Sequence, residues 1–283
     1  MKRSEPTDPP NTLVGTISYP DVARAIAPTG MVARGGFLAT SDGDLPVRSD
    51  GRATVAMVVV GNIGGTMWPR FRREQRDEPD PLDAWTRRLL APIADAFGAE
   101  LVHPSDTPHP PILTWARRAA DVWPSPIGLL VDPQYGLWHA YRGALLFADV
   151  VTELPAPSGL ESPCVGCAQP CLTSCPVDAF APGRYDHERC RRHVRSGDEP
   201  HCLTDGCAAR RACPVNVDGY YGADQMTFHM RAFVGEATDA GSSTDEVGGD
   251  VDPEPSGERE ALDVDAFVVA VEAAPERGEV DRR

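Results

Sequence analysis

The feature that most constrains this chain is a group of eight cysteines, the only ones in its 283 residues, which all lie within 50 residues of sequence. They divide into two runs of four, and the last cysteine of each run is followed directly by proline. The first run is Cys164, Cys167, Cys171 and Cys175, and the second is Cys190, Cys202, Cys207 and Cys213. Two runs of four cysteines that each end in Cys-Pro are typical of a segment that binds two 4Fe–4S clusters.

The spacing within the runs suits a four-iron cluster. Such a cluster needs four thiolates around a compact core, and Cys164-Val165-Gly166-Cys167 supplies two from one short loop. Gly166 and Gly206 carry no side chain where the backbone would approach the inorganic sulfides, and proline turns the chain away after the last cysteine. In paired sites of this kind the fourth cysteine of each run binds the other cluster. This predicts one cluster on Cys164, Cys167, Cys171 and Cys213 and a second on Cys175, Cys190, Cys202 and Cys207.

The intervals differ from the common bacterial form, and cysteines also serve in zinc sites and disulfides. The first run reads C-x2-C-x3-C-x3-C-P and the second C-x11-C-x4-C-x5-C-P, which is much looser. Structural zinc normally uses two C-x2-C knuckles, and the sequence has one. Disulfides suit small secreted scaffolds, and nothing marks this chain as secreted. One cluster together with another metal is a further alternative, and two clusters are the prediction that we favour.

Composition and charge indicate where such a chain works. Basic residues at Lys2 and Arg3 are not followed by an apolar run, so no Sec-type signal peptide is expected. The longest aliphatic stretch, Val55–Val60, is too short to span a bilayer. We therefore expect a soluble, cytoplasmic protein without a membrane partner. The net charge of −15 is uneven, because from Gly235 onward 15 acidic residues stand against 4 arginines.

The pattern along the chain predicts an α+β fold in four parts. These are a flexible N-terminus at 1–12, an α/β domain at 13–157, a ferredoxin-type domain with two clusters at 158–234, and a disordered acidic tail at 235–283, whose composition cannot bury enough apolar surface to fold. Within the α/β domain we expect helices at 19–27, 81–97 and 112–121, and strands at 31–39, 53–60 and 99–102. We also expect a hairpin of 127–131 with 137–151 around the turn 132–136.

One stretch resembles a known family. Trp115-Ala116-Arg117-Arg118-Ala119 precedes Ile127-Gly128-Leu129-Leu130, then Tyr135-Gly136-Leu137-Trp138 and Gly143-Ala144-Leu145-Leu146-Phe147. With the cysteine runs that follow, this order resembles the epoxyqueuosine reductases, corrinoid-dependent iron–sulfur enzymes of tRNA modification. The resemblance implies a corrinoid or flavin-like cofactor, cobalamin or a flavin, in the α/β domain. It also aligns Asp106 with that family's proton-donating aspartate, although Asp106 before Thr-Pro also suits a turn or cap residue.

The chain departs from that family in ways that bear on partners. The family continues after its clusters into helical repeats that help to grip tRNA, and here an acidic tail stands in their place. Because binding to phosphate backbones relies on clustered Lys and Arg, we expect no tRNA partner and instead a redox partner protein. The preferred function is electron transfer through two clusters. The alternative is a reductase in which the clusters reduce a cofactor in the N-terminal domain, so whether the chain is an enzyme stays open at this point.

Overall fold

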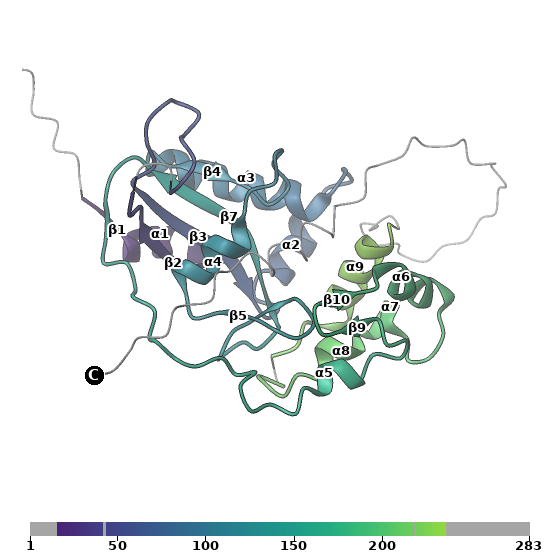
Figure 1. Cartoon of the computed structure of the whole chain (residues 1–283). Coiled ribbons are helices and arrows are strands. Elements are labelled where there is room, and N and C mark those ends of the chain that lie inside the picture. Colours follow the sequence, from purple (N-terminus) through teal and green to yellow (C-terminus); the bar gives the residue numbers. More distant parts are fainter. Residues whose placement is uncertain (1–15, 42–43, 218, 236–283) are drawn as a thin grey trace, which may run out of the picture.

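The computed structural model describes residues 16–41, 44–217 and 219–235, and Figure 1 shows how its elements are arranged. The expected N-terminal segment 1–12 and, apart from Gly235, the expected tail 235–283 lie outside the described residues. The predicted α+β class is confirmed, since helices are combined with a main sheet whose strands are all antiparallel.

The main sheet has four strands in the order β2-β3-β7-β4. Their bounds are Val32–Leu38 for β2, Ala56–Ile63 for β3, Glu100–Val102 for β4 and His139–Phe147 for β7. The central strand β3 pairs with β7 along its length. The register of β2 on β3 shifts between Ala33 and Gly36, and Gly35 there has a φ of +91°. The pairing of β2 with β3 is therefore irregular at Gly35-Gly36.

Helices cover both faces of this sheet. On one face lie α1 (Tyr19–Ile26), the 3-10 helix η1 (Ala27–Thr29), α2 (Trp68–Glu74) and α3 (Pro81–Ala96), and on the other lies α4 (Ile112–Ala119). Val58 and Val60 of β3 pack in the first core, whereas Met57 and Val59 pack with α4 in the second. Because successive strand side chains point to opposite faces, a strand covered on both sides is apolar at every position, which explains the unbroken run in the sequence.

Most elements expected in the N-terminal part are present within a few residues of their predicted bounds, but the hairpin is wrong in its pairing. The turn from Asp132 to Gly136 does form, closed by backbone hydrogen bonds of 2.9 and 2.8 Å. However, β6 (Leu130–Val131) pairs with β5 (Trp123–Pro124), whereas β7 pairs with β3 and β4. The backbone of β7 is hydrogen-bonded to β3 on one edge and to β4 on the other, so it does not pair with the short segment before the turn. Helix α2 was not predicted.

The cysteine-bearing part consists of short elements and two longer helices. They are α5 (Pro170–Thr173), β9 (Phe180–Ala181), β10 (Arg184–Tyr185), α6 (His187–Ser196), α7 (Cys202–Asp205), α8 (Ala208–Arg211) and α9 (Ala223–Val234). A two-stranded parallel pair, β1 (Ile17–Ser18) with β8 (Val151–Thr152), closes the N-terminal part. Phe228 of α9 reaches into the first sheet core, and Trp68 Nε1 donates a hydrogen bond to Asp224. The domain bounds at 157 and 158 stay predictions.

Candidate functional site

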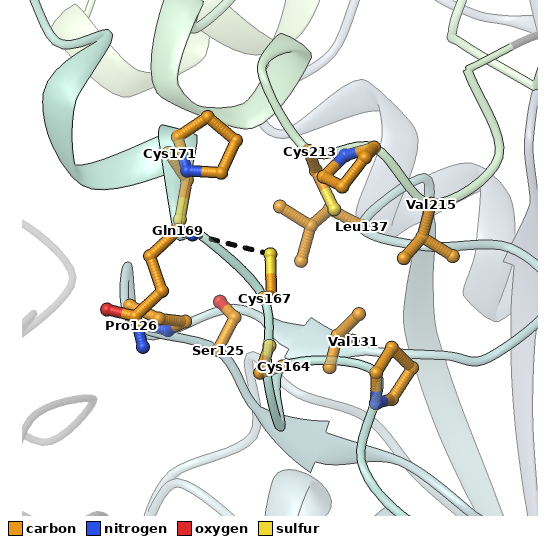
Figure 2. Close-up of a pocket in the computed structure, with 13 residues that line it drawn as sticks. Ser125, Pro126, Val131, Leu137, Cys164, Cys167, Gln169, Cys171, Cys213 and Val215 are labelled. Atoms are coloured by element: carbon orange, nitrogen blue, oxygen red, sulfur yellow. Dashed lines mark hydrogen bonds between the residues drawn. The ribbon is translucent and has the colours of Figure 1, made fainter.

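Four cysteines line one pocket in the C-terminal part. They are Cys164, Cys167, Cys171 and Cys213, and we call them the first group. Figure 2 shows them around a common space that Val131, Leu137 and Val215 close on one side. The pocket holds about 350 Å³ of space, part of it open to solvent. Val131 and Leu137 come from either side of the turn 132–136, so the sheet-bearing part of the chain helps to build this wall.

The other four cysteines line a second pocket, which is also partly open to solvent. They are Cys175, Cys190, Cys202 and Cys207, and we call them the second group. Phe180, His193 and Met230 are among the side chains that complete its wall. The membership of the two groups is the one expected from the sequence, with Cys175 and Cys213 each lying in the pocket of the other run. That the cysteines act as cluster ligands stays a prediction.

All eight cysteines are free thiols, and burial disfavours the charged form of six of them. Burial raises the pKa of Cys164, Cys171, Cys202, Cys207 and Cys213 above the ordinary thiol value. It raises the pKa of Cys190 to about 11. Without a metal these thiols are therefore protonated at neutral pH, and binding of a metal group would displace their protons.

Backbone amides point at sulfur in both groups. The amide of Gln169 donates to Cys167 Sγ at 3.4 Å, shown as the dashed line in Figure 2, and that of Ala179 donates to Cys175 Sγ at 3.3 Å. Gly166 and Gly206 have φ of +72° and +76°. A Cβ on Gly206 would lie 2.7 Å from Met226 Sδ, whereas one on Gly166 would meet nothing within 4 Å. Glycine at position 166 is therefore explained by its left-handed backbone conformation and not by a close contact.

The described side chains do not form a site for a single metal ion. Across residues 16–41, 44–217 and 219–235, no group of three or more His, Cys, Asp or Glu side chains could hold one ion. The four sulfurs of each group instead border a pocket with mostly apolar walls. A donor set of four thiols around a space wider than one ion suits a larger sulfur-ligated group.

The two parts of the chain meet at an arginine of α8. Arg210 donates from Nε and Nη2 to the carbonyl of Leu137, at 3.0 and 2.6 Å. Its guanidinium also lies over the rings of Trp138 and Tyr221, 4.4 and 4.7 Å from their centroids. Leu137 lines the pocket of the first group, so Arg210 ties that wall to the helix between Cys207 and Cys213. We did not identify Arg210 from the sequence, where it is one arginine among many.

Several buried polar atoms at this junction have no hydrogen-bond partner among the described residues. They are Trp138 Nε1, both amide atoms of Gln225 and Nε2 of His229. Burial, together with the positive charges of Arg142 and Arg210, lowers the pKa of His229 to about 3, so this imidazole is neutral. Buried polar atoms without partners are uncommon and call for an explanation. The sequence had suggested no role for Gln225.

Asp106 occupies a turn beside α3, away from both cysteine groups. Its carboxylate accepts hydrogen bonds from the amide of His103 and from Arg87 Nη2, both at 2.7 Å. Burial by itself would raise its pKa, but these hydrogen bonds and the charge of Arg87 outweigh burial, so the pKa lies below the ordinary carboxyl value. The structure thus shows the turn-capping arrangement that was the alternative interpretation of this residue. Its catalytic role stays a prediction.

Comparisons with known proteins gave similar structures only. No protein-family model matches the chain, and no curated protein matches it. An epoxyqueuosine reductase structure is similar with a TM-score of 0.46 and 14% identity, over 74% of this chain and 68% of that one. The C. elegans B12-trafficking protein CblC is similar with a TM-score of 0.47 and 12% identity, over 76% of this chain and 92% of that one. Both are similarities of structure at low sequence identity.

One expectation about partners is contradicted. We expected no tRNA partner, yet an epoxyqueuosine reductase with an epoxyqueuosine-modified tRNA-Tyr stem loop is similar, with a TM-score of 0.46 and 15% identity over 72% of this chain and 66% of that one. That expectation is withdrawn. None of the helices in the described ranges is both long and apolar enough to cross a membrane. The cytoplasmic location stays a prediction.

Proposed function

We propose that this chain is an iron–sulfur electron-transfer protein with two 4Fe–4S clusters. The observation that carries the proposal is the gathering of the eight cysteines into two pockets of four thiols each. Four thiolates are the ligand set of a 4Fe–4S cluster. The first group would hold one cluster and the second group the other, and each would supply a site that gains and loses one electron.

The remaining residues of the two pockets suit that role. The amides of Gln169 and Ala179 donate to cysteine sulfurs, and hydrogen bonds to sulfur are one of the means by which a protein sets a cluster's reduction potential. Apolar side chains such as Val131, Leu137 and Phe180 line the pockets beside the sulfurs. Their protons leave when metal binds, which couples cluster assembly to pH.

The stoichiometry of anaerobically reconstituted protein tests the proposal. Two clusters require about eight iron and about eight sulfide per chain. Iron near four per chain, or zinc in place of iron, would reject the claim of two clusters. The EPR spectrum of the reduced protein then distinguishes two interacting clusters from one.

A second candidate function is a reductase that passes cluster electrons to an organic cofactor in the N-terminal part. What favours it is the set of buried polar atoms without partners at the junction, on Trp138, Gln225 and His229. A bound polar molecule there would satisfy them. Trp138 directly follows Leu137, which lines the pocket of the first group. The sequence resemblance implies a corrinoid or flavin-like cofactor.

Titration of the reconstituted protein with hydroxocobalamin, FMN and FAD tests this second function. We expect saturable binding of one of them at micromolar concentration, about −8 kcal/mol, and a spectral change of the bound cofactor when the clusters are reduced. Gln225→Ala removes two of the atoms in question and should weaken binding. The absence of saturable binding for all three would leave the electron carrier alone.

A further inference from the structure

A stripe of arginines lies on the outer face of helix α6, beside the second cysteine group. Arg189, Arg192 and Arg195 are exposed and follow one another at three-residue intervals, which places them along one side of the helix. Cys190, on the same helix, lines the second pocket. The stripe is therefore a positively charged surface next to the site of the proposed second cluster.

Three acidic residues close to the stripe in the sequence contact other side chains. The carboxylate of Glu188 lies 3.2 Å from His187, and that of Glu199 lies 2.8 Å from His201. Asp198 accepts a hydrogen bond from Ser196. Among the residues that the structure describes, no carboxylate forms an ion pair with the three arginines of the stripe.

The end of α9 is fixed against this same helix. Arg191 Nε donates to the carbonyl of Phe233 at 3.0 Å, and its guanidinium lies over the Phe233 ring, 5.6 Å from the centroid. Arg195 donates to the carbonyl of Val234. Figure 1 shows α6 and α9 side by side, in agreement with the contacts between them. Whatever follows Gly235 thus leaves the described part of the chain next to the stripe.

The sequence that follows Gly235 is complementary in charge. Residues 236–258 hold eight Asp or Glu and no Lys or Arg. Their covalent attachment at the end of α9 gives them an effective concentration near α6 on the order of millimolar. The stripe from Arg189 to Arg195 rises about 9 Å, which about three extended residues can span. Glu236 and Asp239 are therefore within reach of it.

We propose that the acidic segment 236–258 docks on the arginine stripe of α6. In the docked state, carboxylates of the same chain would pair with Arg189 and Arg192, which form no ion pair among the described residues. The consequence for electron transfer rests on the proposed function: docking would change the charge that the surface beside the second group presents to a redox partner. Because the contacts are exposed charge pairs, docking is weak and sensitive to salt.

The reactivity of the arginines tests the proposal in the full-length, reconstituted protein. Phenylglyoxal modifies accessible guanidinium groups, and mass spectrometry gives a rate for each arginine. In one variant the eight acidic residues of 236–258 become the corresponding amides, and in a control variant the seven acidic residues from Glu260 onward do. Arg117, which is exposed on α4, serves as an internal reference.

We expect Arg189 and Arg192 to react roughly threefold or more faster in the 236–258 variant than in the unchanged protein at low salt. The control variant should match the unchanged protein, and the difference should vanish in 1 M salt, where charges are screened beyond about 3 Å. Equal rates in the unchanged protein and the 236–258 variant, or equal acceleration in the control variant, would overturn the docking. Iron content of the same samples separately decides the cluster proposal.

Discussion

Gly136 lies against the backbone of Val215, so closely that a Cβ on Gly136 would stand 2.3 Å from the Val215 carbonyl oxygen. Gly136 ends the turn that precedes β7, and its φ is +58°. Val215 follows Cys213 by two residues and lines the first pocket. This contact joins the turn of the N-terminal part directly to the segment that carries a cysteine of the first group.

The contact can be tested by a substitution with a matched control. Gly136→Ala should destabilise the protein by about 2 kcal/mol or more, because both the positive φ and the Val215 backbone oppose a side chain. Gly98→Ala, at a φ of +60° but with nothing within 4 Å of the added Cβ, should cost only about 1 kcal/mol. Urea denaturation measures both values. Equal losses of stability in the two variants would show that the contact with Val215 does not prevent a side chain at position 136.

The crossed grouping of the cysteines predicts which cluster each variant loses. Cys213→Ala should damage the cluster of Cys164, Cys167 and Cys171, because all four line one pocket. Cys175→Ala should damage the cluster of the second group instead. EPR spectra of the two variants, compared at equal protein concentration, report which signal is lost first. If Cys213→Ala removed only the signal of the second group, the crossed arrangement would be wrong.

The acidic end of the chain should contribute little to stability. A chain that ends at Gly235 keeps the cap of α9 and loses a segment whose composition buries little apolar surface. We expect unchanged iron content and a melting temperature shifted by no more than about 3 °C. Calorimetry of the two reconstituted chains checks this. A larger drop would show that residues beyond Gly235 belong to the packed fold.

Buried His139 should make stability depend on pH. Burial and the charge of Arg34 lower its pKa to about 4, below the ordinary value of about 6.5. The unfolded chain therefore binds the proton more readily, and the free energy of unfolding should fall by about 2 kcal/mol between pH 7 and pH 5. His139→Gln should remove that part of the slope, whereas His109→Gln, at an exposed position, should leave it. Urea denaturation at both pH values measures the slopes.

Asp106→Asn separates a capping role from a proton-donating one. The amide can still accept from His103 N but loses its ion pair with Arg87, so a loss of stability of about 1 kcal/mol is expected. If Asp106 also donates a proton, the variant should bind cofactor and clusters normally. Its proton-coupled reduction of the cofactor should then be slower than in the unchanged protein. Ser105→Ala, in the same turn, is the control. Equal turnover in the two variants would assign Asp106 to capping alone.

Much of the sheet-bearing part could be predicted because its signals are local. The apolar run at 53–60 and the helical repeat of Leu82, Trp85 and Leu90 report the burial of single elements, and β3 and α3 lie where these patterns place them. Helix α2 was missed because its two buried side chains, Trp68 and Phe71, stand among arginines, which hide the periodicity.

The partner of β7 could not be predicted in this way. The turn at 132–136 is a local feature and was recognised from Asp132, Pro133 and Gly136. Which strand lies beside β7 depends on residues far away in the sequence, such as Val59 of β3 opposite Ala144. Pairing across long intervals is decided by the burial of both faces of the sheet, and no short stretch of sequence contains that information.

The sequence by itself determined the number of thiols, their two runs and their division into two sets, because cysteine spacing and the proline that follows are written along the chain. Only the tertiary structure decided what surrounds them. Leu137 and Val215 meet in one wall through the contacts of Gly136 and Arg210, and the rings of Trp138 and His229 both pack against Tyr221. Burial and hydrogen bonding arise only when distant segments pack, so these features appear only in the folded chain.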